Sequence, residues 1–516
     1  VSIKINLFVL LLTALLLFSL RQIFNYIKLT YRARVMFDLN KKNRQDLLKK
    51  FFNSNYVFQK KYPKGDLINL FTNEVNNSAV GMLSVVDIIS YSIMTLSYVV
   101  LLSLISFEFT IFSICVLIIS ALIPFRYVKQ SYKIGEIITK FNSIIGEFLI
   151  SRFNSSLLIK LTSNSKIENY KFDNLTKEQK NYSLKSTILF NKTDLIIEPI
   201  IILTSLIFIY ISYSYFNFSL EIIGIYLVII IRLIPVFKAI LKSIQSYRTF
   251  QGPINKVIKS INDIDRNIEI DEGFKTFSKL DEKIRFENVS FAYEKNINVI
   301  DNVSFNILAN KMNAIIGSSG SGKSTILNLI SKLIKPLDGN IYYDKENIKD
   351  IKNTFIRGII SYCPQETIIF SNSLIDFITY GSDRIDLDKV KLIIEKTGCK
   401  DFIDIDDESF VNINPNDLSQ GQKKRIDICR ILYSDKQIII FDEPTANLDE
   451  YNTRIIIELI KDLKSKYKKT IILIEHQLRY IKNFENIIVI KKGKIESFGS
   501  HEDLVKNNNW YKNALN

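Results

Sequence analysis

The residues best suited to chemistry lie in a glycine-rich run of the C-terminal half. An apolar segment that begins at Met312 predicts a strand before the run, and a helical pattern follows it. The run consists of Gly317, Ser318, Ser319, Gly320, Ser321, Gly322, Lys323, Ser324 and Thr325. Its spacing matches G-x-x-x-x-G-K-[ST] in the required strand–loop–helix context, which disfavours a chance glycine-rich loop. We therefore predict that the backbone N–H groups and Lys323 bind the phosphates of a nucleoside triphosphate and that Ser324 ligates Mg²⁺.

Two adjacent carboxylates follow a second apolar run. Ile438 to Phe441 predicts a buried strand, and Asp442 and Glu443 stand at its end. A carboxylate pair at the carboxyl edge of a sheet suits metal and water positioning, so we expect Asp442 to hold Mg²⁺ and Glu443 to orient or deprotonate an attacking water. By itself such a pair is often a solvated turn, but the phosphate-binding loop upstream disfavours that alternative.

A third apolar run, Thr470 to Ile474, precedes one of the two histidines. A lone histidine is usually structural, but His476 stands where the end of a strand could reach the γ-phosphate. His501 is predicted to be a surface residue. The four cysteines are scattered without a CxxC pair, so we predict small packed residues rather than disulfides. They are Cys115, Cys363, Cys399 and Cys429.

The N-terminal half contains apolar runs near the length that crosses a bilayer. They are roughly Ile5–Leu20, Val80–Ser103, Phe109–Phe125, Leu195–Tyr215 and Ile222–Leu241. Lys and Arg are absent from 65–125 and from 193–231, as the hydrocarbon core requires. The first run lacks a small-residue cleavage site and is followed by Arg21 and Lys28, so it is predicted to be a span rather than a signal peptide.

The placement of the basic residues decides what the net charge of +15 means. Such a charge could indicate nucleic-acid binding. However, 21–64 and 126–192 carry twelve Lys and Arg each, whereas the turns near 106–108 and 216–221 carry none. This asymmetry follows the positive-inside rule, and it predicts membrane topology without nucleic acid as a partner.

The number of spans is odd, which places the two ends of the chain on opposite sides of the membrane. Because the first residue is Val1 and not Met, we expect an N-terminally truncated fragment that lacks one span. Asp87, Glu198 and Arg232 lie at or within the spans. Charge is costly there, so they are predicted to line a cavity or to form ion pairs, with positions near the interfaces or pairing between helices as the plainer alternative.

The expected fold class is a multi-domain chain, an all-α transmembrane bundle followed by an α/β P-loop NTPase domain. Residues 1–250 would form the bundle, 251–282 a linker that Gly252-Pro253 marks, and 283–516 the NTPase domain. The alternating segment 284–293 predicts the first strand of that domain.

The ordered motifs resemble the nucleotide-binding domain of ABC transporters from about residue 283 to the end. By this resemblance Tyr293 stacks on adenine, Gln365 joins Mg²⁺ and senses the membrane domain, and His476 is the switch histidine. The signature motif, which caps ATP held by a second domain, is matched by Leu418, Ser419, Gln420, Gly421 and Gln422, and the D-loop by Ala446, Asn447, Leu448 and Asp449. The chain departs from the family pattern at Gln420 and Ala446, where the family usually has Gly and Ser, and 411–416 lacks the usual Gly-Glu.

The order of the two halves resembles an exporter-type half transporter. The segment 49–75 is similar to the first intracellular loop of that group with its coupling helix, and the missing span would be the family's first. One P-loop and one signature cannot complete an ATP sandwich, so the resemblance implies a second half transporter. A homodimer is expected, and the departures at Gln420 and Ala446 leave a heterodimer open.

The implied activity is ATP hydrolysis with Mg²⁺ that drives export or flipping of a hydrophobic or amphipathic cargo. Candidate cargoes are a lipid, a lipid-linked glycan, a drug or a peptide. The expected location is the plasma (inner) membrane of a bacterium, with the bilayer as a partner and the nucleotide-binding domain in the cytoplasm. Three alternatives stay open: an ATP-gated channel or regulatory ABC protein, an importer of similar fold, and a soluble ABC ATPase, which the spans disfavour.

Overall fold

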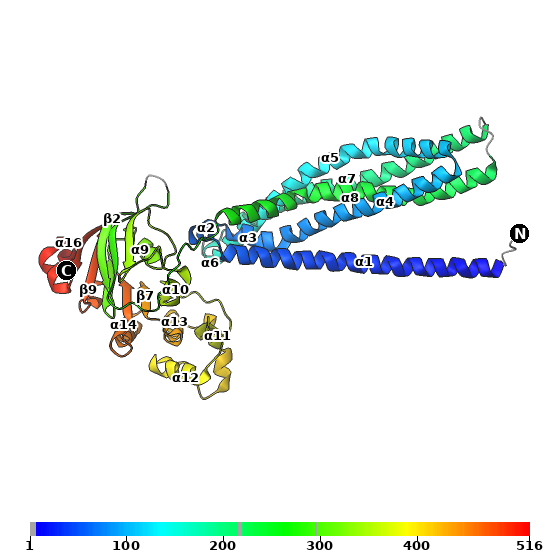
Figure 1. The fold of residues 1–516 in the computed structure, drawn as a ribbon. Helices are drawn as coiled ribbons and strands as arrows, with labels where there is room; N and C mark the ends of the chain where they lie inside the picture. The colour runs from blue at the N-terminus through cyan, green and yellow to red at the C-terminus, as the bar shows by residue number, and fades with distance from the viewer. Residues whose placement is uncertain (1–6, 215–218, 295–296, 447, 516) are drawn as a thin grey trace. The chain divides into compact units, whose positions relative to one another are not determined.

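The computed structural model describes residues 7–214, 219–294, 297–446 and 448–515 of the chain (Figure 1). The chain divides into two compact units, Val1–Glu269 and Ile270–Asn516, and each is described by itself. Some predicted features lie outside the described residues: the start of the first span at Ile5, the end of the fourth at Tyr215, part of the turn at 216–221, and Asn447.

The N-terminal unit is built from long helices. They are α1 (Leu7–Phe52), α4 (Val75–Ile105), α5 (Phe107–Asn154), α7 (Ser165–Ser214) and α8 (Leu220–Arg266). Among the described residues, five helical segments of 42 to 50 residues are apolar enough to cross a membrane by length and composition, which confirms the five predicted spans. Because a bilayer core needs only about 20 helical residues, each helix continues well beyond its apolar part.

Four of these helices form the packed body of the unit. Figure 1 shows α4, α5, α7 and α8 running side by side, with α1 packed mainly along α4. The core contains Ile197 and Ile201 of α7 together with Tyr226 of α8, all nearly inaccessible to solvent. The packing thus matches the predicted all-α bundle.

Charged residues in the spans pair between helices. Asp87 of α4 accepts hydrogen bonds from the Arg32 guanidinium of α1, with a shortest distance of 2.8 Å. Glu198 of α7 pairs with Lys238 of α8 at 2.5 Å. The alternative of pairing between helices is therefore confirmed for Asp87 and Glu198, while Arg232 is an exposed residue of α8.

The segment that resembles an intracellular loop forms short helices between α1 and α4. They are α2 (Tyr56–Lys61), α3 (Lys64–Asn69) and the π-helix η1 (Leu70–Glu74); a further short helix, α6 (Ser156–Leu161), joins α5 to α7. A Cβ added to Gly65 would lie 2.7 Å from the backbone of Glu147, so α3 rests directly on α5. An ion pair between Asp66 and Lys256 also joins α3 to α8.

The predicted linker differs from the structure in its first half. Gly252 and Pro253 lie inside α8, which continues to Arg266. Pro253 lacks the N–H that would bond the carbonyl of residue 249, a loss that a helix tolerates at a cost. Gly252 permits close packing, because a Cβ there would lie 3.1 Å from the Glu136 Cα of α5. Gly-Pro therefore marks a tight helix crossing here, and the two units divide after Glu269.

The C-terminal unit contains two sheets. The strands are β1 (Lys283–Phe291), β2 (Ile300–Leu308), β3 (Met312–Ile316), β4 (Asp338–Tyr343), β5 (Glu346–Asn347), β6 (Ile360–Cys363), β7 (Ile438–Asp442), β8 (Thr470–Ile474), β9 (Asn486–Lys491) and β10 (Lys494–Gly499). An antiparallel sheet has the order β2-β1-β4-β5, and a six-stranded sheet has the order β10-β9-β3-β8-β7-β6, in which β9, β3, β8, β7 and β6 are parallel. Continuous apolar runs such as Ile438–Phe441 are buried on both faces, as parallel sheets require.

Helices of the same unit complete the predicted α/β class. They are α9 (Lys323–Ile330), α10 (Asn353–Gly358), α11 (Leu374–Ile378), α12 (Leu387–Lys396), α13 (Gln420–Ser434), α14 (Glu450–Ser465), α15 (His501–Asn507) and α16 (Asn509–Leu515), with short 3₁₀ turns at Cys399–Asp401, Glu408–Asn412, Pro415–Asp417 and Leu478–Tyr480. A separate core of α11, α12 and α13 forms a helical subdomain.

Two minor predictions, that all four cysteines are packed and that His501 is a surface residue, differ from the structure. Cys363, Cys399 and Cys429 are buried free thiols, but Cys115 is exposed, because its side of α5 is not covered by other helices of the chain. His501 is only half-exposed, and its Nδ1 lies 2.7 Å from the buried Tyr511 hydroxyl. Its position beside α16 explains why it is not a simple surface residue.

Candidate functional site

The glycine-rich run forms a tight loop between β3 and α9. A Cβ on Gly317 would lie 2.2 Å from the Ile490 carbonyl oxygen, and one on Gly322 would lie 2.6 Å from Ile300 Cδ1. Gly322 also has a φ of +108°, which favours glycine. The loop therefore cannot carry larger residues at these two positions. Ser318, Ser319 and Gly320 are exposed at its tip, whereas Ser321 is buried and its Oγ has no hydrogen-bond partner within the described residues.

Lys323 lies inside the loop. Its Nζ donates hydrogen bonds to the carbonyl oxygens of Gly317 (2.9 Å) and Ser318 (3.1 Å). Burial lowers the pKa of Lys323, while the negative charges of Glu443 and Asp442 act in the opposite direction. A buried ammonium group held only by neutral carbonyls favours an anion such as a phosphate beside it. The neighbouring Ser324 is exposed.

Tyr293 is tied to the helix that follows the loop. Its hydroxyl accepts a hydrogen bond from Asn328 Nδ2 at 3.3 Å and lies 3.5 Å from Thr325 Oγ1. Its ring packs edge-on against Phe291 with 4.9 Å between the ring centroids. About a third of the residue is exposed. Adenine stacking by Tyr293 stays a prediction.

The structure brings together three predicted residues from different parts of the sequence. Glu443 Oε1 lies 2.6 Å from His476 Nε2, and Glu443 Oε2 accepts a hydrogen bond of 2.7 Å from Gln365 Nε2. Glu443 has a φ of +47°, a conformation that non-glycine residues adopt at a cost. The carboxylate is therefore held in one orientation from both sides.

Strand order explains this meeting. β6, β7 and β8 are neighbours and parallel, so their carboxyl ends share one edge of the sheet. Cys363 of β6 pairs with Phe441, and Asp442 pairs with Ile474 of β8. Gln365 lies two residues beyond the end of β6, and His476 lies two residues beyond the end of β8. Both side chains reach the carboxylate of Glu443, the first residue after β7.

Glu475 is a residue that the sequence analysis did not single out. Its carboxylate is buried and accepts hydrogen bonds from Thr445 Oγ1 (2.5 Å) and from the His476 N–H (2.8 Å). It thereby holds the backbone beside the histidine. The sequence feature that could have pointed to Glu475 is an acidic residue between an apolar strand and a histidine, although such a residue is usually solvated.

Asp442 lies beside this group and is only half-exposed. Burial raises the pKa of Asp442, and the hydrogen bond from the Tyr362 hydroxyl (3.0 Å) lowers it. The oxygen ligands that Mg²⁺ prefers are available from Ser324, Gln365 and Asp442. Within the described residues no group of three or more His, Cys, Asp and Glu could hold a metal. Such a site fits a Mg²⁺ ion bound by few protein ligands together with phosphates, and the buried ammonium of Lys323 fits the phosphates.

The signature segment begins a helix. Ser419 caps α13: its Oγ accepts from the Gln422 N–H, and Gln422 Oε1 accepts from the Ser419 N–H at 2.9 Å. Ser419 and Gln420 are exposed and Leu418 is half-buried. A Cβ on Gly421 would lie 2.7 Å from Asn452 Cγ of α14, so this glycine permits close packing.

The D-loop aspartate lies beside this contact. Asp449 caps α14 and accepts hydrogen bonds from both nitrogens of Asn452, the residue against which Gly421 packs. In the described part of the chain no hydrogen bond or ion pair links 418–422 to the loop at 317–325. The structure therefore joins the signature segment to the D-loop but not to the phosphate-binding loop of the same chain.

Comparison with known proteins agrees with this geometry. The model of the ABC transporter family matches residues 300–446, a range that includes the phosphate-binding loop, the signature segment and the carboxylate pair. The matched segment is an ABC transporter domain. The match lies within the C-terminal unit and includes β3, α9, α13 and β7.

Two relatives differ in how much of this chain they match. The lactococcin-G-processing and transport ATP-binding protein of Lactococcus lactis subsp. lactis is 35% identical over 276 residues, which cover 53% of this chain and 38% of that protein. The heterocyst differentiation ATP-binding protein of Nostoc sp. (strain PCC 7120) is 25% identical over 494 residues, 94% of this chain and 80% of that protein. The chain thus spans well under half the length of the first relative.

A solved structure resembles this chain over almost its whole length. A bacterial Atm1-family ABC exporter with ATP bound superimposes with a TM-score of 0.85 and 20% identity, covering 98% of this chain and 89% of that one. This likeness shows the fold. A helical unit with five apolar helices among the described residues, followed by an α/β domain that contains the matched ABC segment, confirms the predicted fold class.

Proposed function

We propose that this chain is one half of an ATP-driven exporter and that Glu443 is its catalytic carboxylate. The observation that carries the proposal is the position of that carboxylate between His476 and Gln365. It lies at the edge of the sheet at which β3 ends and the phosphate-binding loop begins. A carboxylate held from both sides is oriented before the reaction, which lowers the cost of placing an attacking water.

The predicted site residues supply the remaining parts of phosphoryl transfer. Lys323 and the loop N–H groups would bind the β- and γ-phosphates, and Tyr293 would stack on adenine. Ser324, Gln365 and Asp442 would hold Mg²⁺, which supplies charge neutralisation on the phosphates when bound. Glu443 would orient or deprotonate the water. His476 would hold Glu443 in place and would itself contact the γ-phosphate.

We propose a dimer because one chain offers two separate halves of an ATP site. Leu418 to Gln422 and Asp449 would bind ATP held by a second ABC domain. The exposed N-terminus of the 15-residue helix α13 presents free N–H groups and positive potential there. A second copy of this chain is the proposed partner, and a different half transporter is the alternative that Gln420 and Ala446 leave open.

Closure of the two ATPase domains would switch the membrane helices and move a cargo outward. We propose a hydrophobic or amphipathic cargo, from the class of lipids, lipid-linked glycans, drugs or peptides, because the spans are apolar and carry few charges. The proposed location is the bacterial plasma membrane, with the ATPase domain in the cytoplasm on the basic side.

The test is ATP turnover by the chain alone, reconstituted in lipid vesicles. Glu443→Gln should abolish turnover while Mg²⁺–ATP binding is retained. A matched control, Glu450→Gln, removes a carboxylate that pairs with Arg454 on the surface of α14 and should leave turnover unchanged. Turnover that survives Glu443→Gln would refute the assigned role, and a folded chain without turnover would refute the homodimer.

A further inference from the structure

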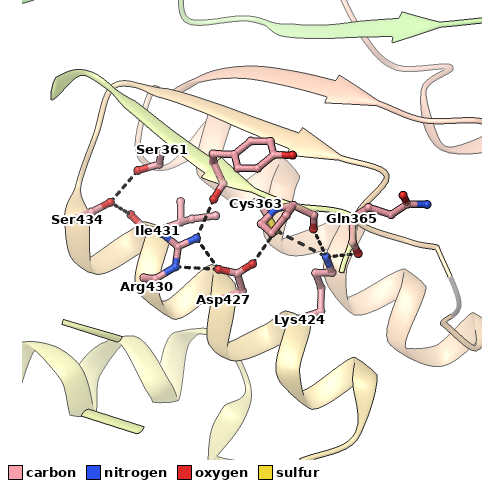
Figure 2. Close-up of polar contacts among 10 residues, drawn as sticks. Ser361, Cys363, Gln365, Lys424, Asp427, Arg430, Ile431 and Ser434 are labelled. Atoms are coloured by element: carbon pink, nitrogen blue, oxygen red, sulfur yellow. Dashed lines mark hydrogen bonds and ion pairs between the residues drawn. The ribbon is translucent and has the colours of Figure 1, made fainter. Parts of the chain in front are cut away.

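Hydrogen bonds join the signature helix α13 to the five consecutive residues that end at Gln365 (Figure 2). Two hydroxyl groups meet at one end, and charged side chains of α13 reach backbone and thiol groups at the other. The contacts are Ser434 Oγ to Ser361 Oγ (2.8 Å), Arg430 Nη2 to the Tyr362 carbonyl (2.7 Å), Cys363 Sγ to Asp427 Oδ2 (3.4 Å), and Lys424 Nζ to the carbonyls of Pro364 (2.6 Å) and Gln365 (2.9 Å). We call this set the β6–α13 seam.

The seam follows from helical spacing. Lys424, Asp427, Ile431 and Ser434 are three or four residues apart, so they share the face of α13 that lies along β6. Figure 2 shows their side chains directed toward that strand. The strand residues therefore meet the helix residues in antiparallel order, from Ser361 beside Ser434 to Gln365 beside Lys424.

Buried charges make the seam rigid. Lys424 and Asp427 are 3% and 1% exposed. Asp427 is neutralised by Arg430 at 2.6 Å, and burial raises the pKa of the Cys363 thiol well above its ordinary value, so the thiol is a neutral donor to Asp427. Loss of one partner would leave a buried charge or carbonyl unpaired, which is costly. α13 and the strand end therefore move as one body.

Lys424 lies at the end of the seam that is nearest to the proposed catalytic carboxylate of Glu443, to which Gln365 connects it. It holds the carbonyl of Gln365, and the side-chain amide of the same residue donates to Glu443 Oε2. We propose that Lys424 is a positioning residue for ATP hydrolysis, which fixes the backbone at Pro364 and Gln365 so that the amide holds Glu443 in place. This inference rests on the proposed function of Glu443.

The N-terminus of α13 connects the role of Lys424 to the second ATP site. Ser419, the proposed contact to ATP of the second ABC domain, lies five residues before Lys424, a distance of about 7.5 Å along a helix axis. A displacement of the helix N-terminus on meeting that ATP would pass through Lys424 to Gln365. Occupancy of one ATP site would thus adjust the carboxylate of the other.

The first test separates turnover from binding. Lys424→Met keeps the length of the side chain but removes its N–H donors, and it should lower kcat about tenfold while KM for ATP stays within about twofold. Lys424→Gln, which retains two N–H donors, should recover part of the loss. The matched control is Lys389→Met, because Lys389 Nζ also donates to a backbone carbonyl of α13, that of Tyr433 at 2.8 Å, away from Gln365. The kcat of this control should not change.

A double-mutant cycle asks whether Lys424 acts through Gln365. In a Gln365→Ala chain, Lys424→Met should lower kcat no further, because the amide that it positions is gone. Effects that multiply would mean that Lys424 acts by another route, and an unchanged kcat in the single variant would also overturn the proposal.

Amide hydrogen exchange supplies a readout that does not depend on turnover. Lys424→Met should speed exchange in the peptide that covers 361–368, and Lys389→Met should not. Unchanged exchange in that peptide would overturn the proposed positioning even if the chain shows no turnover. Absence of turnover in the parent chain, with the exchange effect present, would instead refute the proposed homodimer and leave the positioning by Lys424 supported.

Discussion

Glu443 Oε1 and His476 Nε2 lie 2.6 Å apart, each just beyond the end of one of two adjacent parallel strands. The histidine is itself fixed, because the buried Glu475 accepts a hydrogen bond from its backbone N–H. Glu443 is thereby oriented by a residue 33 positions away in the sequence. Sheet geometry, rather than any local motif, produces this contact.

This contact predicts that His476 supports turnover more than binding. His476→Ala should lower kcat by about 10²- to 10³-fold, the range for removing one group that stabilises charge in the transition state, while Mg²⁺–ATP binding changes little. The measurement is steady-state ATP turnover together with equilibrium nucleotide binding. His501→Ala removes the only other histidine and is the control. Equal losses in the two variants would contradict a specific role for His476.

The phosphate-binding loop predicts different outcomes at two glycines. Gly322→Ala places a Cβ 2.6 Å from Ile300 Cδ1 at a φ of +108°, whereas Gly320→Ala, at a φ of +76°, has no atom within 4 Å. In the folded chain Gly320→Ala should therefore cost only the backbone strain of about 1–2 kcal/mol. Gly322→Ala should also displace the loop and lower the free energy of unfolding further. Thermal unfolding measures the difference, and equal unfolding temperatures in the two variants would show that the close approach at Gly322 does not matter.

The crossing of α5 and α8 predicts a stability difference in the N-terminal unit. A Cβ on Gly135 would lie 1.9 Å from the Thr249 carbonyl oxygen, which is backbone and cannot rotate away. Gly135→Ala should lower the free energy of unfolding by about 1–3 kcal/mol or more. Gly224→Ala, with nothing within 4 Å on α8, is the control. Thermal unfolding in the same lipid checks the prediction, and equal unfolding temperatures would reject it.

Glu485 predicts a pH dependence of stability. Partial burial opposes its ionisation, but hydrogen bonds from Lys464 (2.8 Å) and the Met312 N–H (2.9 Å) together hold its pKa below the ordinary value. A carboxylate with a lowered folded-state pKa stabilises the fold above its unfolded pKa, about 4.3, and loses this contribution as pH falls through the folded value.

Glu485→Gln should therefore destabilise the chain at neutral pH, and the difference from the parent should shrink as the pH falls below about 4.3. Thermal unfolding at a series of pH values measures the difference. Glu502→Gln replaces an exposed carboxylate on α15 and should show no such change. A difference for Glu485→Gln that stays constant with pH would contradict the prediction.

Much of the site could be predicted because it depends on short contiguous patterns. The loop from Gly317 to Lys323 needs small residues and a lysine at fixed spacing, and the pair Asp442-Glu443 needs only an apolar strand before it. The five spans could be predicted for the same reason, since hydrocarbon demands an uninterrupted apolar run. Gly252-Pro253 misled the prediction of the linker, because glycine and proline mark a turn in most contexts but a close helix crossing here.

By itself the sequence determined the class of each half of the chain, the loop that is suited to phosphate and the carboxylates that follow it, because each depends on neighbours along the chain. Only the tertiary structure decided that Gln365, Glu443 and His476 meet and that Lys424 holds the carbonyl of Gln365. Those contacts depend on the order β8-β7-β6 and on the face that α13 turns to β6. Strand order and helix orientation are set by packing across the whole domain, which no short segment encodes.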